Sequence, residues 1–206
     1  MPRRAKEEAE KTKKRILDNA LALFVKKGYE KTTFTDIASR LKMTKGAVYW
    51  HFESKEKLLM ALVDEMLAKF QQQIARNMPQ EGLTYPAVSK MMVDLAQSTL
   101  SDARSREFFL LMKTQVRWGE ASMARVREDM LKNNPLCPFH AFRQAVENDK
   151  AAGRVRPDVD AEEVSAVSLA VWDGLVQAKI DGFLKKSVEE TLSHAYEATW
   201  KAIGSV

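Results

Sequence analysis

The side chains best suited to chemistry lie in one short stretch, Thr44 to Phe52, which reads Thr-Lys-Gly-Ala-Val-Tyr-Trp-His-Phe. Large side chains with polar tips predominate in it, and Val48 and Phe52 would share the inward face of a helix. Gly46 is unusual there, because glycine destabilises a helix by roughly 1 kcal/mol relative to alanine. Close approach of another backbone would explain the glycine. The stretch therefore favours a helix that is pressed against a partner.

A second short helix is expected immediately before this stretch. Apolar residues recur there at helical spacing, at Phe34, Ile37, Ala38 and Leu41. Thr33 and Asp36 are spaced as a variant of the capping box, and Thr44 can cap the next helix after a tight turn. A short helix, a turn of about four residues and another short helix is the plan of a helix-turn-helix.

The charge of the chain is concentrated at the same end. Residues 1–60 contain 15 Lys or Arg and 8 Asp or Glu, a net charge of +7, whereas the remainder contains 18 and 20, a net charge of −2. A basic module on a nearly neutral body is typical of a nucleic-acid binder. A membrane-surface helix would have the same sign of charge, but these basic residues are scattered around a helical core.

Three motifs carry a resemblance to a known family. Residues 32–38, 43–52 and 54–59 resemble the DNA-binding domain of TetR-family transcriptional regulators, and the string Gly-Ala-Val-Tyr-Trp-His-Phe is similar to the AcrR-type efflux regulators. The match covers about residues 12 to 65. An ordinary three-helix core is the alternative, but it leaves the exposed Tyr-Trp-His without a purpose.

The resemblance implies that the second helix spans the DNA backbone and the third enters the major groove. The expected DNA-binding residues are Thr33, Thr44, Lys45, Gly46, Tyr49, Trp50, His51 and Lys55. Trp50 stands where many members of the family have tyrosine, so its contact, with base or backbone, stays open.

Composition sets the frame for the rest. The chain has 206 residues, of which 30% are charged and 45% hydrophobic, as in an ordinary globular protein. Its single cysteine, Cys137, excludes an internal disulfide and suits a reducing compartment. The sequence has neither an apolar run of about 18–20 residues nor a signal peptide. A cytoplasmic location is therefore expected.

An all-α fold of about nine helices is predicted, because glycines are few and no segment alternates over strand length. The expected domains are a helix-turn-helix domain at 1–58, with an arm at 1–10 that is either a solvated tail or a DNA contact, and a ligand-binding and dimerisation domain at 59–206. A long helix from Ser54 to about residue 78 joins them. Further helices are expected at about 86–100, from 105, at 121–133, 139–152, 161–184 and 187–203.

The middle helices contain many Met and aromatic residues, which adapt to varied ligands. We expect a mostly apolar pocket for a small hydrophobic effector, lined by Met91, Met92, Phe108, Phe109, Met112, Trp118, Phe139, Phe142 and Trp172. The competing interpretation is that these side chains simply fill the core.

The last two helices are apolar around much of their circumference, which favours burial against a second subunit. The expected interface residues are Val164, Val167, Ser168, Val171, Leu175, Leu192, Ala195 and Thr199. In the resembled family these helices pair across a two-fold axis as a four-helix bundle. Burial within a monomer is the alternative.

Nothing in the sequence predicts catalysis. Cys137 and His140 are spaced as two metal ligands could be, but further ligands or an orienting third group are not evident. We expect no cofactor and no metal. The predicted function is a ligand-released homodimeric repressor on a palindromic operator. The alternatives are an activator, a regulator with a protein partner or no ligand and, remotely, a helical enzyme.

Overall fold

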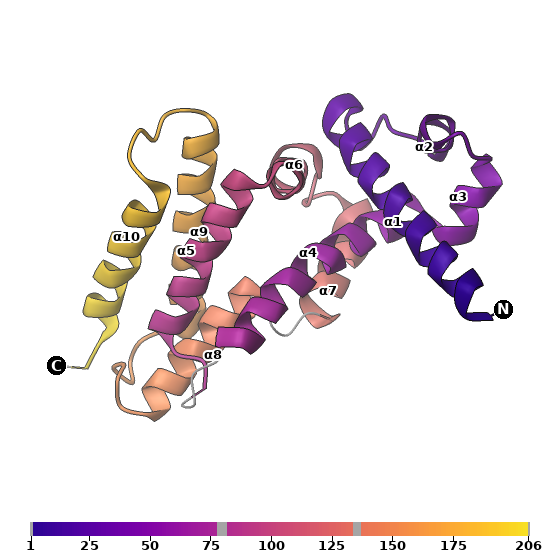
Figure 1. The fold of residues 1–206 in the computed structure, drawn as a ribbon. Helices are drawn as coiled ribbons and strands as arrows, with labels where there is room; N and C mark the ends of the chain where they lie inside the picture. The colour runs from indigo at the N-terminus through magenta and orange to yellow at the C-terminus, as the bar shows by residue number, and fades with distance from the viewer. Residues whose placement is uncertain (1, 78–81, 134–136, 206) are drawn as a thin grey trace. The chain divides into compact units, whose positions relative to one another are not determined.

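The computed structural model describes residues 2–77, 82–133 and 137–205, and their regular structure is helical (Figure 1). The elements are α1 (Pro2–Lys27), α2 (Phe34–Leu41), α3 (Lys45–His51), α4 (Lys55–Asn77), α5 (Tyr85–Ser101), α6 (Ala103–Leu110), a π-helical segment η1 (Leu111–Gln115), α7 (Ala121–Asn133), α8 (Pro138–Ala151), α9 (Ala161–Ile180) and α10 (Val188–Ile203). One isolated β-bridge joins Val155 and Gly204. The predicted all-α fold is confirmed.

The chain packs as two compact units, each made of two segments. One unit comprises Met1–Met66 and Ala103–Lys132, and the other comprises Leu67–Asp102 and Asn133–Val206. Helix α4 contributes residues to both units. These units reflect packing alone, so the expected functional division into residues 1–58 and 59–206 stays a prediction.

The first unit has one hydrophobic core built from both of its segments. Phe24, Ile37, Leu58 and Leu62 are fully buried in it, as the apolar stripes of α1, α2 and α4 require. Side chains from the second segment complete the same core, at Leu111, Val116, Met123 and Val126. The helix-turn-helix therefore packs partly on residues more than forty positions beyond it in the sequence.

A buried arginine links three helices of this unit. Arg104 of α6 forms an ion pair with Asp18 of α1 and donates to Glu65 Oε2 of α4 at 2.8 Å. An arginine fork suits two carboxylates because its donors diverge in a fixed plane. The second segment is thus tied to the first by charge as well as by apolar packing.

The second unit contains α5, α8, α9 and α10, and Figure 1 shows α5, α9 and α10 side by side. Asp149 of α8 is fully buried and accepts hydrogen bonds from Tyr85 N at 2.7 Å and Arg154 Nε at 2.8 Å. Trp172 of α9 donates from its indole nitrogen to Met92 O of α5 at 2.8 Å. These bonds fix the start and the middle of α5 against its neighbours.

Three helix boundaries differ from expectation. Residues 2–10, expected as an arm or tail, are the first turns of α1. The helix expected to reach residue 184 ends at Ile180, because Gly182 adopts a φ of +78° and its backbone N–H donates to Lys179 O. The helix expected from residue 105 divides into α6 and η1.

Two expected breaks, at 79–82 and 133–138, fall largely on residues outside those described, 78–81 and 134–136. Among the described residues, no helix is long and apolar enough to cross a membrane.

Candidate nucleic-acid interface

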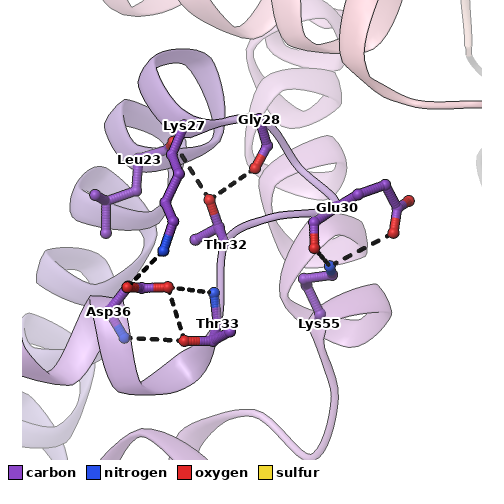
Figure 2. Close-up of polar contacts among 8 residues, drawn as sticks. All are labelled: Leu23, Lys27, Gly28, Glu30, Thr32, Thr33, Asp36 and Lys55. Atoms are coloured by element: carbon purple, nitrogen blue, oxygen red, sulfur yellow. Dashed lines mark hydrogen bonds and ion pairs between the residues drawn. The ribbon is translucent and has the colours of Figure 1, made fainter.

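The start of α2 is fixed by the predicted capping box (Figure 2). Thr33 Oγ1 accepts from Asp36 N at 3.2 Å, and Asp36 Oδ2 accepts from Thr33 N at 2.8 Å and from the Thr33 hydroxyl at 2.7 Å. Each residue thereby satisfies the other's free backbone N–H. The Thr33 hydroxyl, which was expected to face DNA, is fully occupied by the cap.

Lys27 reinforces this cap from the end of α1, as Figure 2 shows. Its ammonium lies 2.7 Å from Asp36 Oδ1. The bond from Lys27, followed by those from Thr33, lowers the pKa of Asp36 from 3.8 to about 2. The sequence analysis assigned Lys27 only to a helix end, because its partner lies across a loop.

The turn between α2 and α3 is tight. Lys42 adopts a left-handed conformation with φ 56°, and Met43 N donates to Ala38 O at 2.9 Å. Thr44 then caps α3 by accepting from Ala47 N at 3.2 Å. Both caps predicted from the sequence are therefore present, and they fix where α3 begins.

Helix α3 buries one face and presents aromatic side chains on the other. Val48 and Phe52 are buried, whereas Tyr49 is 48% and Trp50 is 74% exposed. The Tyr49 ring packs edge-on against Phe34, with 4.8 Å between ring centroids, and the Lys45 ammonium lies 5.4 Å from the Tyr49 ring centroid. A cation over an aromatic face is attracted by the ring quadrupole. These contacts orient Lys45 and Tyr49 outward.

Gly46 lies in the first turn of α3 and is exposed. A Cβ added there would meet only Thr44 Oγ1, at 3.9 Å, which is an ordinary van der Waals contact. The protein's own packing therefore does not require a glycine at this position. A helix that keeps a destabilising glycine without an internal reason is one that another molecule approaches closely.

His51 sits at the edge of this surface. Its ring lies edge-on to Trp50, with 4.6 Å between centroids. Partial burial, followed by the charge of Lys13, lowers the pKa of His51. Lys13 of α1 is thus near the end of α3, which the sequence analysis missed because the spacing between helices is not written in the sequence.

Lys55, the last of the expected contacts, is occupied within the protein. Its ammonium donates to Tyr29 O at 2.9 Å and to Glu30 O at 3.1 Å, and it lies 3.9 Å from Glu30 Oε2 (Figure 2). It also lies 4.5 Å from the Tyr29 ring centroid. The structure therefore gives Lys55 a role in fixing α4 to the loop before α2. A DNA contact by Lys55 stays a prediction.

Together these elements define a helix-turn-helix whose third helix presents a basic, aromatic and sterically open surface. Phosphate binding suits its Lys and Tyr groups, and base edges in a major groove are within the reach of side chains at the start of such a helix. The class of protein is a helix-turn-helix DNA-binding regulator.

Residues 16–62 match the family model described as bacterial regulatory proteins, tetR family. The chain belongs to the TetR family of transcriptional regulators. It is 29% identical over 180 residues to the HTH-type transcriptional regulator TtgR of Pseudomonas putida, covering 86% of this chain and 84% of that protein. It is 28% identical over 186 residues to the probable acrEF/envCD operon repressor of Escherichia coli, covering 86% and 80%.

Solved structures agree on the fold. SmeT bound to triclosan, the repressor of the SmeDEF multidrug efflux pump of Stenotrophomonas maltophilia, matches with a TM-score of 0.76 at 22% identity, covering 94% of this chain and 92% of that one. NalD, the secondary repressor of the MexAB-OprM multidrug efflux pump of Pseudomonas aeruginosa, matches with a TM-score of 0.73 at 20% identity, covering 96% and 98%.

The nine residues expected to line an effector pocket are divided between the units. Met91, Met92, Phe139, Phe142 and Trp172 belong to the second unit, and Phe108, Phe109, Met112 and Trp118 belong to the first. Phe108, Met112 and Trp118 pack on the first unit's core, so filling the core accounts for them. The pocket itself stays a prediction.

The eight expected interface residues divide by exposure. Val164, Ser168 and Leu192 are buried within the subunit, and the Ser168 hydroxyl lies 3.1 Å from the Tyr85 hydroxyl. Val167 is 48% exposed. Val171, Leu175, Ala195 and Thr199 are partly exposed and remain available to a partner.

Proposed function

We propose that the protein is a homodimeric transcriptional repressor that binds a palindromic operator and is released by a small, mostly apolar effector. The observation that carries DNA binding is the outer surface of α3, where Tyr49 and Trp50 are exposed beside a glycine that the fold does not need. A site with these features needs a partner with a groove and negative charge, and the local net charge of +7 attracts one.

The proposed DNA contacts follow from the local geometry. Thr44 and Lys45 stand at the start of α3, where lysine can donate to O6 or N7 of a guanine. Tyr49 and His51 carry polar tips suited to phosphate oxygens, and Trp50 offers an apolar face to a sugar or a thymine methyl. The N-terminus of α2, capped by Thr33, offers backbone N–H groups and a favourable dipole to a phosphate.

A dimer is proposed because one short helix-turn-helix contacts too little DNA for tight binding. Val167, Val171 and Leu175 place apolar side chains on the accessible part of α9. Gly174 lies among them in the middle of the helix, and a Cβ added there would meet nothing within 4 Å. As with Gly46, a helical glycine without an internal reason favours close approach of a second backbone. A two-fold dimer would read a two-fold symmetric site.

The proposal of repression rests on the relatives. The probable acrEF/envCD operon repressor is similar over most of its length, and the fold matches repressors of multidrug efflux pumps. Triclosan, the ligand of the SmeT complex, is small and largely apolar. We therefore propose that this protein controls genes for efflux of such compounds and works in the cytoplasm, where chromosomal DNA is accessible.

Release is proposed to pass through the helices that connect the units. Helix α4 belongs to both units, and α6, which follows α5 directly, is tied to α1 and α4 through Arg104. An effector that displaces helices of the second unit would move α4 and separate the two α3 helices from successive major grooves, about 34 Å apart. A hundredfold loss of DNA affinity requires a coupling free energy of about 2.7 kcal/mol.

A genome-wide map of bound DNA, read with transcript levels in a strain lacking the protein, tests the regulatory role. We expect a palindromic site beside a transporter gene whose transcript rises in the deletion strain. A fall in that transcript would instead identify an activator. Specific binding that survives the double variant Lys45→Ala, Tyr49→Ala would contradict the assignment of α3.

Calorimetry of triclosan binding with and without operator DNA tests the effector. Because coupling is reciprocal, operator DNA must weaken binding of an inducer by the same factor by which the inducer weakens DNA binding. Equal affinities in both conditions would show that triclosan is not an inducer.

Sedimentation tests the dimer. A charge in an apolar interface is strongly destabilising, so Val171→Asp should give monomers at micromolar concentration and lower operator affinity. The matched control is Glu162→Gln, an exposed change in the first turn of α9. A wild-type chain that is monomeric yet binds the operator tightly would rule the dimer out.

A further inference from the structure

A groove lies between α5 and α10 in the second unit, with a volume of about 440 Å³. Tyr85, Ser89 and Val93 line it from α5, and Ser193, Tyr196 and Trp200 line it from α10. None of the nine residues predicted for the effector pocket belongs to its lining. Small-molecule sites usually have volumes of about 300–1,000 Å³, so the groove has room for a small ligand.

One wall of the groove is aromatic and rigid. The Tyr85 ring is stacked nearly parallel to Trp200, with 5.9 Å between centroids and an angle of 8°, and it lies edge-on to Tyr196 at 6.4 Å. Tyr196 donates from its hydroxyl to Ser168 O at 3.3 Å, and the Tyr85 hydroxyl lies 3.1 Å from Ser168 Oγ. Because these hydroxyls hold the rings from behind, the wall is formed before any ligand arrives.

Ser89 supplies a polar group that the protein leaves unsatisfied. Its residue is 7% exposed, and its Oγ is buried without a hydrogen-bond partner in the described part of the chain. It lies near enough to the Tyr85 hydroxyl to influence its pKa, but not in hydrogen-bonding geometry. A helical serine usually donates to the carbonyl four residues back, as Ser165 does to Ala161 O at 2.6 Å. An unsatisfied buried hydroxyl is rare, and a ligand would satisfy it.

The charges at the mouth balance. Lys90 and Asp94 of α5 carry opposite signs, and the Glu197 carboxylate of α10 is paired with the Lys201 ammonium at 2.6 Å. The mouth therefore favours neither an anion nor a cation. A neutral ligand loses the least hydration on entering.

We propose that this groove binds small neutral aromatic molecules with one hydrogen-bonding group, of the size of a two-ring phenol. The ring packs on the wall formed by Trp200 and Tyr85, and its polar group exchanges a hydrogen bond with Ser89 Oγ. The site is separate from the predicted effector pocket and does not depend on DNA release.

Calorimetry of 2-naphthol binding to the full-length protein tests the proposal. We expect saturable binding with a Kd below about 100 µM. Ser89→Ala should weaken binding about threefold to tenfold, since one hydrogen bond is lost. It should not lower the unfolding temperature, because no bond within the protein is removed.

Ser193→Trp distinguishes this groove from any other site. Ser193 is exposed, so the substitution fills the groove without disturbing the core, and it should abolish binding. The matched control is His194→Trp, at the adjacent exposed position of α10 outside the lining, which should bind as the wild type does. Undiminished binding in Ser193→Trp, or no saturable binding by the wild type up to millimolar 2-naphthol, would overturn the proposal.

Discussion

Single side chains in the helix-turn-helix either hold the motif together or face outward, and the structure separates the two roles. The hydroxyl of Thr33 and the ammonium of Lys55 are engaged by the protein, whereas Lys45, Tyr49 and Trp50 are presented on the outside. Variants of the two groups should therefore fail in different assays. The first group should change folding stability, and the second should change DNA affinity.

Gly46→Ala should separate stability from binding. Alanine has room at this position and is the better helix former, so the free energy of unfolding should stay the same or rise by up to about 1 kcal/mol. Operator affinity, measured by fluorescence anisotropy, should fall at least about tenfold, because the methyl group occupies the space in which DNA approaches.

The control for this prediction is Gly119→Ala in the same unit, where an added Cβ also meets nothing within 4 Å but the turn lies outside the helix-turn-helix. Unchanged operator affinity in Gly46→Ala would show that the glycine has no role in recognition.

The capping box gives stability a defined dependence on acid. The pKa of Asp36 is lowered from 3.8 to about 2, so the unfolded chain takes up this proton at a higher pH than the folded protein does. The stabilisation is therefore complete above about pH 5 and is lost as the pH falls from about 4 to 2.

Asp36→Asn should remove this dependence. At fixed protein concentration, its urea midpoint should lie below that of the wild type at pH 6, and the gap should close toward pH 2. Glu53→Gln, an exposed carboxylate outside the cap, should leave the acid limb unchanged. A gap that is the same at pH 6 and pH 2 would mean that ionised Asp36 does not stabilise α2.

Among the elements, the junction between α4 and the loop before α2 depends on Lys55. Its ammonium bridges two backbone carbonyls and lies over the Tyr29 ring. Hydrogen bonds from a charged donor contribute about 1.5–3 kcal/mol when removed. Lys55→Ala should lower the free energy of unfolding by an amount near the lower end, because the side chain is partly exposed.

Lys45→Ala provides the contrast. Its exposed ammonium should contribute little to folding, so this variant should unfold like the wild type but lose affinity and base preference for the operator. Chemical denaturation and competition binding on the two variants measure the difference. Equal stability of both variants would contradict the role given to Lys55.

The sequence was informative where the deciding contacts are local. The caps by Thr33 and Thr44, the stripe that buries Ile37 and the outward Tyr49 and Trp50 all follow from spacings of a few residues, and they were predicted. The contacts of Lys55 reach back 25 and 26 residues, so no local pattern shows them. The end of α9 was missed for another reason, because Gly182 was not weighed as a left-handed cap.

Longer-range packing was beyond sequence reasoning altogether. A pattern of apolar residues shows which face of α6 or α7 is buried, but not that Leu111 and Val126 join the core of the helix-turn-helix. The groove between α5 and α10 was missed as well. Nothing in the sequence marks Ser89 as a hydroxyl without a partner, because that depends on the helix that covers it.

For the whole molecule, the uneven charge predicts a strong response to salt. The net charge of +7 in residues 1–60 and −2 elsewhere concentrates counterion release at the DNA-binding end. If each subunit neutralises a few phosphates, operator affinity should fall by roughly 10³-fold or more between 50 and 200 mM salt. A titration by anisotropy measures the slope, and a flat response would contradict DNA recognition by this end.

The two-segment construction of the DNA-binding unit also bears on how the protein is made. Translation delivers α1 to α4 first, but the apolar surface of these helices is completed by Leu111, Val116, Met123 and Val126. Until those residues leave the ribosome, a growing chain carries a helix-turn-helix with part of its core missing. An mRNA cut short before this point would yield a fragment with the operator-reading helix but without the packing that supports it. The cell is thus protected from truncated products that could occupy the operator permanently.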